Sequence, residues 1–138
     1  MWSTEYSQET TATPERIWRL WAAVEEWPSW NADIEQIELS GPFAPGGRIV
    51  MKPFGGDPVE LQIADASEPE LFVDEADFGE IVVRTIHRIE RIDDARARVV
   101  YRMVITGPQA ETLGPQIGPQ ISGDFPETLA ALVERAER

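Results

Sequence analysis

The side chains best suited to acid-base chemistry fall on two consecutive predicted strands. His87 is the only histidine of the 138-residue chain and lies among apolar residues of the strand predicted over 80–92. Because imidazole titrates near neutral pH, His87 is the natural general acid or base if the protein is an enzyme. Tyr101, on the strand predicted over 97–106, can donate a hydrogen bond to a ligand carbonyl and stabilise an enolate. Each residue also has a structural alternative, as a hydrogen-bonded, partly buried histidine and as a core aromatic ring.

Alternation along these two strands predicts which way their side chains point. Arg84 and Arg88 share one parity, as do Arg98 and Arg102 on the next strand. Charged side chains at alternate positions indicate an exposed face, so the residues between them are expected to point toward a concave apolar side. These inward residues are Val83, Thr85, His87, Ile89, Val99, Tyr101, Met103 and Ile105.

The residue types give little support to metal or nucleophile chemistry. The chain has no cysteine and a single histidine, which excludes thiolate ligands and cysteine nucleophiles and leaves no typical zinc site. The acidic run 74–80 lacks the ligand spacing of a calcium loop, so it predicts an exposed strand end or turn. No phosphate-binding loop, dinucleotide glycine motif or Ser-His-Asp order is present. We therefore expect neither a metal nor a cofactor.

Charge excludes several classes of partner. The 25 acidic and 12 basic residues give a formal net charge of -13, which opposes nucleic acid and anionic membrane surfaces. No run approaches the ~20 apolar residues of a membrane span, and the first residues lack the features of a signal peptide. We expect a soluble, cytoplasmic protein with one domain over residues 1–138. The sequence leaves the oligomeric state open.

The elements that position these side chains begin with a strand predicted over 3–10. Thr13 is suited to the N-cap of a helix and Pro14 to its first position. An apolar stripe along that helix is expected to pack on the sheet: Ile17, Trp18, Leu20, Trp21 and Val24. Pro28 is expected to end the helix, and Ser29 to cap a second short helical segment over 29–33.

A run of strands separated by Gly, Pro and Asp turns follows, which predicts an antiparallel meander. The predicted strands cover 34–40, 47–53, 59–66, 71–77, 80–92 and 97–106. A loop is expected over 107–114 and a helix over 115–138, broken or kinked near Gly123 and Pro126. The apolar stripe of this helix comprises Ile117, Ile121, Phe125, Leu129, Leu132 and Ala136.

This order of elements predicts a curved sheet wrapped around the terminal helix, with an apolar hollow between them. Trp27 and Trp30 lie at the corner after the first helix, where they can close one end of the hollow or simply pack against each other. The remaining apolar positions of the inner face and the helix stripe either line the hollow or fill the core, and the sequence does not separate the two roles.

Short motifs along the chain carry a family resemblance. They are Thr13-Pro14-Glu15-Arg16-Ile17-Trp18, Trp27-Pro28-Ser29-Trp30-Asn31 followed by Ile37-Glu38-Leu39, Pro45-Gly46-Gly47, and Thr85-Ile86-His87-Arg88-Ile89 paired with Val99-Val100-Tyr101-Arg102-Met103. On these motifs the chain resembles the START-like (SRPBCC) superfamily, in particular its bacterial polyketide cyclase/dehydrase-like branch. The resemblance spans nearly the whole chain.

The resemblance implies an α+β helix-grip fold. In that fold a seven-stranded antiparallel sheet wraps around a long C-terminal helix, two short helices follow the first strand, and a cavity accepts hydrophobic or aromatic ligands. The family has no universal catalytic motif, so no active site is carried over, and the fold alone does not separate cyclases from binding proteins.

Binding of a lipophilic or aromatic small molecule between sheet and terminal helix, by a carrier or sequestering protein, is the first hypothesis. Its ligand contacts are expected from Trp27, Trp30, Met51, Ile63, His87, Ile89, Tyr101, Met103, Ile121, Phe125 and Leu129. The alternative is an aromatase/cyclase-like enzyme acting on a polyketide-type substrate, with His87 as acid or base and Tyr101 as hydrogen-bond donor. A third hypothesis is a stress-associated protein-interaction module whose acidic surface meets a basic partner.

Overall fold

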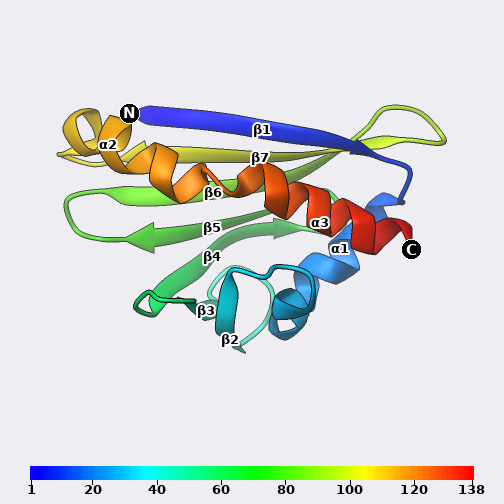
Figure 1. Ribbon diagram of the computed structural model, residues 1–138, viewed down its shortest axis with the longest axis horizontal. Coiled ribbons are helices and arrows are strands. Elements are labelled where there is room, and N and C mark those ends of the chain that lie inside the picture. Colours follow the sequence, from blue (N-terminus) through cyan, green and yellow to red (C-terminus); the bar gives the residue numbers. More distant parts are fainter.

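A seven-stranded antiparallel sheet forms the body of the computed structural model, which describes residues 1–138 (Figure 1). The strand order is β1-β7-β6-β5-β4-β3-β2, so β2 to β7 form a meander and β1 pairs with the last strand. The strands are β1 (Trp2–Thr10), β2 (Ile34–Ser40), β3 (Arg48–Pro53), β4 (Val59–Ser67), β5 (Leu71–Asp77), β6 (Val82–Arg91) and β7 (Ala97–Thr106). The predicted α+β helix-grip architecture is confirmed.

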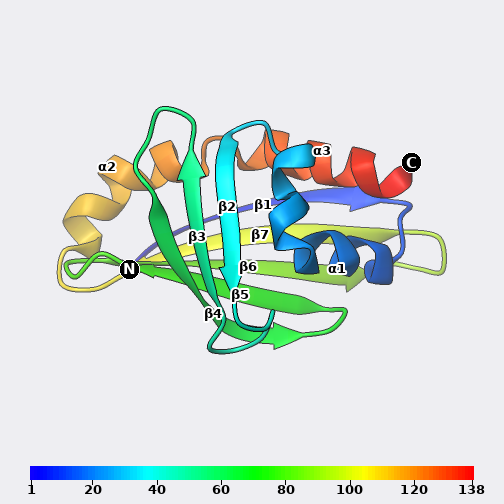
Figure 2. The same cartoon turned by 90° about the horizontal axis from the view of Figure 1, so that it is seen from below.

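Strong curvature turns one half of the sheet across the other. Figure 2 shows β2 and β3 running across the direction of β6 and β7. Register shifts occur between Ile34 and Gln36 on β2 and between Ile63 and Asp65 on β4. Because a bulge bends its strand and increases the local twist, these irregularities favour the curvature that makes one face concave.

The first helix is shorter than the sequence predicts. α1 spans Pro14–Ala22 with Thr13 as its N-cap, and it ends six residues before Pro28. The 3-10 helix η1 (Val24–Ser29) follows and contains Pro28, so the predictions that Pro28 ends α1 and that Ser29 caps a second segment over 29–33 were wrong. The physical reason is Trp27, whose Nε1 donates to the carbonyls of Leu20 and Trp21 at 3.2 and 3.1 Å. The indole thereby satisfies the free carbonyls at the end of α1.

Two helices at the C-terminus cover the concave face of the sheet. α2 (Ala110–Ser122) and α3 (Phe125–Glu137) are separated at Gly123, which confirms the predicted break. The predicted loop over 107–114 was wrong, because α2 already begins at Ala110. None of the helices is long and apolar enough to cross a membrane.

Packing of α2 on the sheet depends on a repeated Gly-Pro-Gln-Ile sequence, over 114–117 and 118–121. The four-residue spacing places Gly114 and Gly118 on one face of the helix, and both are buried against the indole of Trp2 on β1. A Cβ atom at either glycine would overlap that indole. The absence of side chains at these two positions therefore lets α2 lie directly on the sheet edge.

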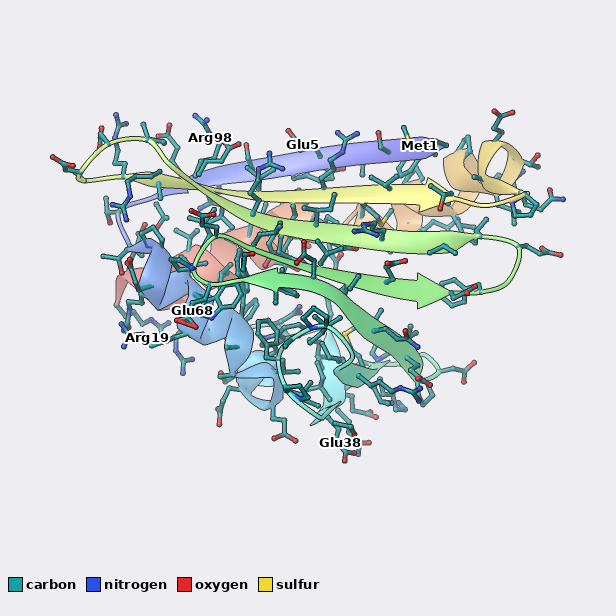
Figure 3. All side chains as sticks on the ribbon, turned by 180° about the vertical axis from the view of Figure 1, so that it is seen from behind. Met1, Glu5, Arg19, Glu38, Glu68 and Arg98 are labelled. Carbon is teal, nitrogen blue, oxygen red and sulfur yellow. The ribbon has the colours of Figure 1, made fainter.

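Side chains divide between the two faces of the sheet as their alternation predicts. Of the eight predicted inward residues, seven are buried and Thr85 is half-buried. The core consists of a larger cluster between α1, α3 and the sheet and a smaller one, around Met103 and Ile105, beneath α2. Figure 3 views the sheet from the side opposite α2 and α3 and shows charged side chains along the outer face, Glu5 and Arg98 among them.

Replacing Gly118 tests the contact between α2 and Trp2. Gly118→Ala is expected to lower the free energy of unfolding by roughly 1 to 3 kcal/mol, because the added methyl group overlaps the indole. In a freely exposed helix position the same change stabilises by about 1 kcal/mol, so even the sign is diagnostic. Urea unfolding measures the difference, with Gln116→Ala on the exposed face of α2 as the control. A Gly118→Ala protein more stable than the wild type would contradict this packing.

Candidate functional site

A cavity of about 280 Å³ lies between the concave face of the sheet, the η1 corner and the bend between α2 and α3. Fourteen of its twenty lining residues are hydrophobic. Seven of the predicted ligand-contacting residues line it: Trp27, Trp30, Met51, His87, Tyr101, Ile121 and Phe125. The structure therefore brings these residues from η1, β3, β6, β7 and the two C-terminal helices to one place.

The other four predicted contact residues do not line this cavity. Ile63, Ile89 and Leu129 are buried in the larger core cluster, and Met103 is buried in the smaller cluster beneath α2. They are buried as the strand and helix patterns predict, but they fill the core and do not form the surface of the cavity.

Aromatic rings from four elements, α1, β5, β6 and β7, form one wall of the cavity. The ring of His87 stacks on Phe72 with centroids 3.8 Å apart, and the rings of His87 and Tyr101 form a T-shaped pair with centroids 4.6 Å apart. Trp21 of α1 packs against Phe72 at 5.1 Å and donates its Nε1 hydrogen to Tyr101 Oη at 3.1 Å. Trp21 and Phe72 were not among the predicted contacts, although Phe72 pairs directly with His87 in the register of β5 and β6.

Burial keeps His87 neutral. Removal from water lowers the pKa of its imidazole to about 3, and the carbonyls of Phe72 and Thr85 oppose this only weakly. Nδ1 lies 3.3 Å from the carbonyl oxygen of Phe72 and, because a carbonyl only accepts, carries the ring proton. The hydrogen bond to the Phe72 carbonyl fixes the orientation of the His87 ring. With its pKa lowered this far, the imidazole is not suited to proton transfer near neutral pH.

Tyr101 belongs to the core and to the cavity wall at once. Its ring is part of the larger buried cluster, and burial raises the pKa of its phenol above the ordinary value. Because Oη accepts a hydrogen bond from Trp21, its own proton is available to a ligand in the cavity. The hydroxyl can therefore donate to a carbonyl oxygen, as the sequence indicates.

Asp74 is the main departure from the sequence-based expectation. The acidic run 74–80 was predicted to be exposed, and Asp77 to Glu80 are exposed, but Asp74 retains only 6% of its surface and lines the cavity. Strand alternation is the reason, because Phe72, Asp74 and Ala76 share the inward parity of β5. The neighbouring Glu75 faces outward and pairs with Arg84 at 3.0 Å. The pattern in the sequence could have found Asp74, but the surrounding carboxylates concealed it.

The carboxyl group of Asp74 has no protein partner. It makes no hydrogen bond or ion pair, and burial, assisted by the negative charge of Glu75, raises its pKa to about 7. Its charge in turn raises the pKa of Tyr101, which indicates that the two groups are close. The cavity therefore holds a carboxyl group whose pKa is raised toward neutral pH.

A second acidic group and two apolar side chains mark the mouth of the cavity. Asp124, at the bend between α2 and α3, has its pKa raised to about 6 by burial and by its hydrogen bond with Asp33. Phe78 and Ile121 also line the cavity while remaining 54% and 40% exposed. No group of three or more His, Cys, Asp or Glu side chains is placed to hold a metal ion.

The raised pKa of Asp74 predicts how stability depends on pH. The folded protein keeps this proton up to about pH 7, whereas the unfolded chain releases it near the ordinary aspartate pKa of 3.8. Ionisation of Asp74 therefore makes the folded state less stable as pH rises from about 4 to 7. Asp74→Asn is expected to exceed the wild type in stability by roughly 1 to 3 kcal/mol at pH 8, and by much less at pH 5.

Urea unfolding of both proteins at the two pH values measures this difference. The opposite effect of neutral His87, which lowers stability below its unfolded pKa of 6.5, is common to both proteins and cancels. A wild type that matches Asp74→Asn at both pH values would show that Asp74 titrates normally.

Comparisons with known proteins agree with this architecture. A solution NMR structure of a protein from Thermobifida fusca aligns with a TM-score of 0.78 and 22% identity, covering 99% of this chain and 93% of that one. A norcoclaurine synthase point mutant from Thalictrum flavum, in complex with a transition-state analogue, aligns with a TM-score of 0.77 and 11% identity over 97% of this chain and 92% of its own. A START superfamily protein from Mycobacterium smegmatis aligns with a TM-score of 0.73 and 16% identity, covering 98% of this chain and 97% of that one.

At these identities the solved structures show the fold alone. A search of the curated proteins finds no matching sequence. The model of the family described as polyketide cyclase / dehydrase and lipid transport matches residues 1–137. The chain therefore belongs to this family.

Proposed function

We propose that the protein binds a hydrophobic or aromatic small molecule in the cavity between the curved sheet and the C-terminal helices, as a carrier or sequestering protein. The observation that carries this proposal is the cavity itself, with its mostly apolar lining and its few convergent polar groups. Apolar pockets of this kind are the usual sites of small-molecule binding. The description of the family, which includes lipid transport, is consistent with this role.

The size of the cavity limits the ligand. Its volume of about 280 Å³ is at the lower end of the range of about 300 to 1,000 Å³ that is usual for ligand pockets. The indoles of Trp21, Trp27 and Trp30 give it flat walls that suit rings. A ligand with one or two rings therefore fits better than a long polyketide chain or a two-chain lipid.

Filling the cavity is expected to abolish binding. Ala76→Phe places a ring where Ala76 lines the cavity, while Val104→Phe adds the same ring to the outer face of β7 as a control. Titration calorimetry with 2-naphthalenemethanol, a neutral two-ring probe, is expected to show binding to the wild type and the control and at least tenfold weaker binding to Ala76→Phe. Circular dichroism checks that both variants fold, and Thr85→Leu is a milder substitution in the same wall.

Equal binding by all these folded proteins would place the probe outside the cavity and contradict the proposal. Failure of the wild type to bind this probe and its amine and acid analogues would contradict it as well.

A second candidate function, an aromatase/cyclase-like enzyme, is favoured by one observation. Asp74 is a partly ionised carboxylate in an apolar cavity, close to the hydroxyl of Tyr101. Such a carboxylate can remove a proton from the carbon next to a ketone while Tyr101 donates a hydrogen bond to the developing enolate oxygen. In this scheme Asp74 is the acid-base residue, and the neutral His87 has a structural role in the cavity wall, where it stacks on Phe72. The interaction-module hypothesis rests on net charge alone and stays a prediction.

Proton exchange at a ketone tests the enzyme hypothesis directly. If Asp74 is a base, the protein is expected to accelerate exchange of the methyl protons of 2-acetylnaphthalene in D₂O, followed by NMR. The rate is expected to increase with pH and level off above about pH 7, because the ionised carboxylate is the active form. Asp74→Asn is expected to lose the acceleration, and Tyr101→Phe is expected to lower the rate of proton exchange about tenfold or more. No acceleration by the wild type would leave the carrier function alone.

A further inference from the structure

We propose that the cavity selects ligands in which a small aromatic or alicyclic body carries a protonated amine, that the carboxylate of Asp74 is the counter-ion of this amine, and that carboxylate ligands of the same shape are rejected. This inference rests on the proposed binding function and names its ligand class. It derives from the charges that face the cavity, which the apolar lining alone does not reveal.

Among the polar groups in the cavity wall without a protein partner are the carboxyl group of Asp74 and the indole N–H of Trp30, and of these only Asp74 can carry a charge. Asp74 retains only 6% of its residue surface, and its carboxyl group makes no hydrogen bond or ion pair with the protein. Tyr101 and His87, which also line the cavity, already bond to Trp21 and to the Phe72 carbonyl. Because a buried carboxylate is stable only when it is paired, a cationic group in the cavity would stabilise it more than a neutral group would.

Charges on the surrounding elements favour a cation as this partner. No Lys or Arg lines the cavity. β4 contributes apolar side chains and α1 an indole, while β6 and β7 contribute the neutral His87 and Tyr101. Arg84, on β6, is held on the outer face by Glu75. The charges that a bound ligand meets are therefore negative, at Asp74 inside and at Asp124 in the mouth.

Aromatic surfaces around Asp74 reinforce the same selection. Trp21, Trp27, Trp30 and Phe72 present rings to the cavity, and the face of an aromatic ring attracts a cation. The Asp33 and Asp124 pair at the mouth and the overall charge of -13 attract cations and repel anions from solution. A carboxylate ligand would meet the opposite field at each step, from the approach to the bound position.

Three ligands with one two-ring skeleton test the inference: 2-naphthalenemethylamine, 2-naphthalenemethanol and 2-naphthoate. Titration calorimetry at pH 8 and low salt is expected to show the amine binding at least tenfold more tightly than the alcohol, and the carboxylate at least tenfold more weakly. Asp74→Asn is expected to remove most of the amine preference, measured as the ratio of the amine affinity to the alcohol affinity in the same protein. Asp65→Asn, an exposed carboxylate on β4, is the matched control and is expected to keep the preference.

Protonation provides a second readout. As pH falls from 8 to 5, Asp74 gains a proton while the amine stays charged, so the amine preference is expected to shrink by up to tenfold per pH unit below about 7. The other titratable groups near the site are Asp33 with Asp124 at the mouth, the neutral His87 and Tyr101 in the wall, and Glu75, which follows Asp74 in β5 but faces outward toward Arg84. Asp124 at the mouth has a pKa of about 6, which lies in the same pH range. The variant Asp124→Asn therefore separates the contribution of Asp124 to the pH dependence from that of Asp74.

The outcomes distinguish this inference from the proposed function. If the alcohol binds the wild type as tightly as the amine does, or if the amine preference survives in Asp74→Asn, the selectivity is overturned and binding in the cavity stands. If the carboxylate binds as well as the amine, the electrostatic argument fails. If none of the three ligands binds, the proposed function fails and the selectivity with it.

Discussion

The hydrogen bond from Trp21 to Tyr101 joins α1 to the middle of the sheet, and the cavity depends on it. It links an indole on the helix to a hydroxyl on β7 inside the larger core cluster. Phe72 and His87 stack beside this pair, so helix α1 is held at a fixed distance from three adjacent strands. The same contact satisfies both buried polar groups, which would otherwise destabilise an aromatic core. Because Tyr101 accepts this bond, its proton remains free to face the cavity.

Two features at opposite ends of the chain prevent the helices from closing the hollow. At the N-terminal end, Trp27 bonds to the last carbonyls of α1 and stops that helix before it can extend over the sheet. At the C-terminal end, Gly114 and Gly118 bring α2 close to β1, and the break at Gly123 turns α3 toward α1. The helices that cover the concave face are therefore held against the sheet at the α1 corner and along β1, and the cavity lies between these two contacts. The apolar surface left uncovered there is the cavity wall.

Sequence patterns with a short period predicted most of the fold, whereas features that depend on contacts between distant residues were not predicted. Alternation located the strands, their inward faces and the antiparallel order, because each of these depends on neighbouring residues. The end of α1 depends on Trp27, and the helical conformation of 110–114 depends on packing beneath Ala110 and against Trp2, so the local sequence was misleading at both places. For the site, the sequence identified aromatic and apolar positions but missed Asp74. The acidity of 74–80 suggested solvent exposure, although the parity of Phe72, Asp74 and Ala76 already pointed inward.

Asp74 also explains why the carrier and enzyme hypotheses share one site. A buried, unpaired carboxylate makes the folded state less stable, and an amide or an alanine at this position would avoid that cost. Residues that break a local rule in this way concentrate at functional sites. An ionised carboxylate in an apolar cavity has two uses, to pair with a proton already carried by nitrogen or to remove one from carbon. Tyr101 adds a donor for an oxygen atom, which only the second use requires, whereas the aromatic rings and the acidic mouth favour the first. The balance of charge around Asp74 therefore supports recognition of an amine more directly than it supports catalysis.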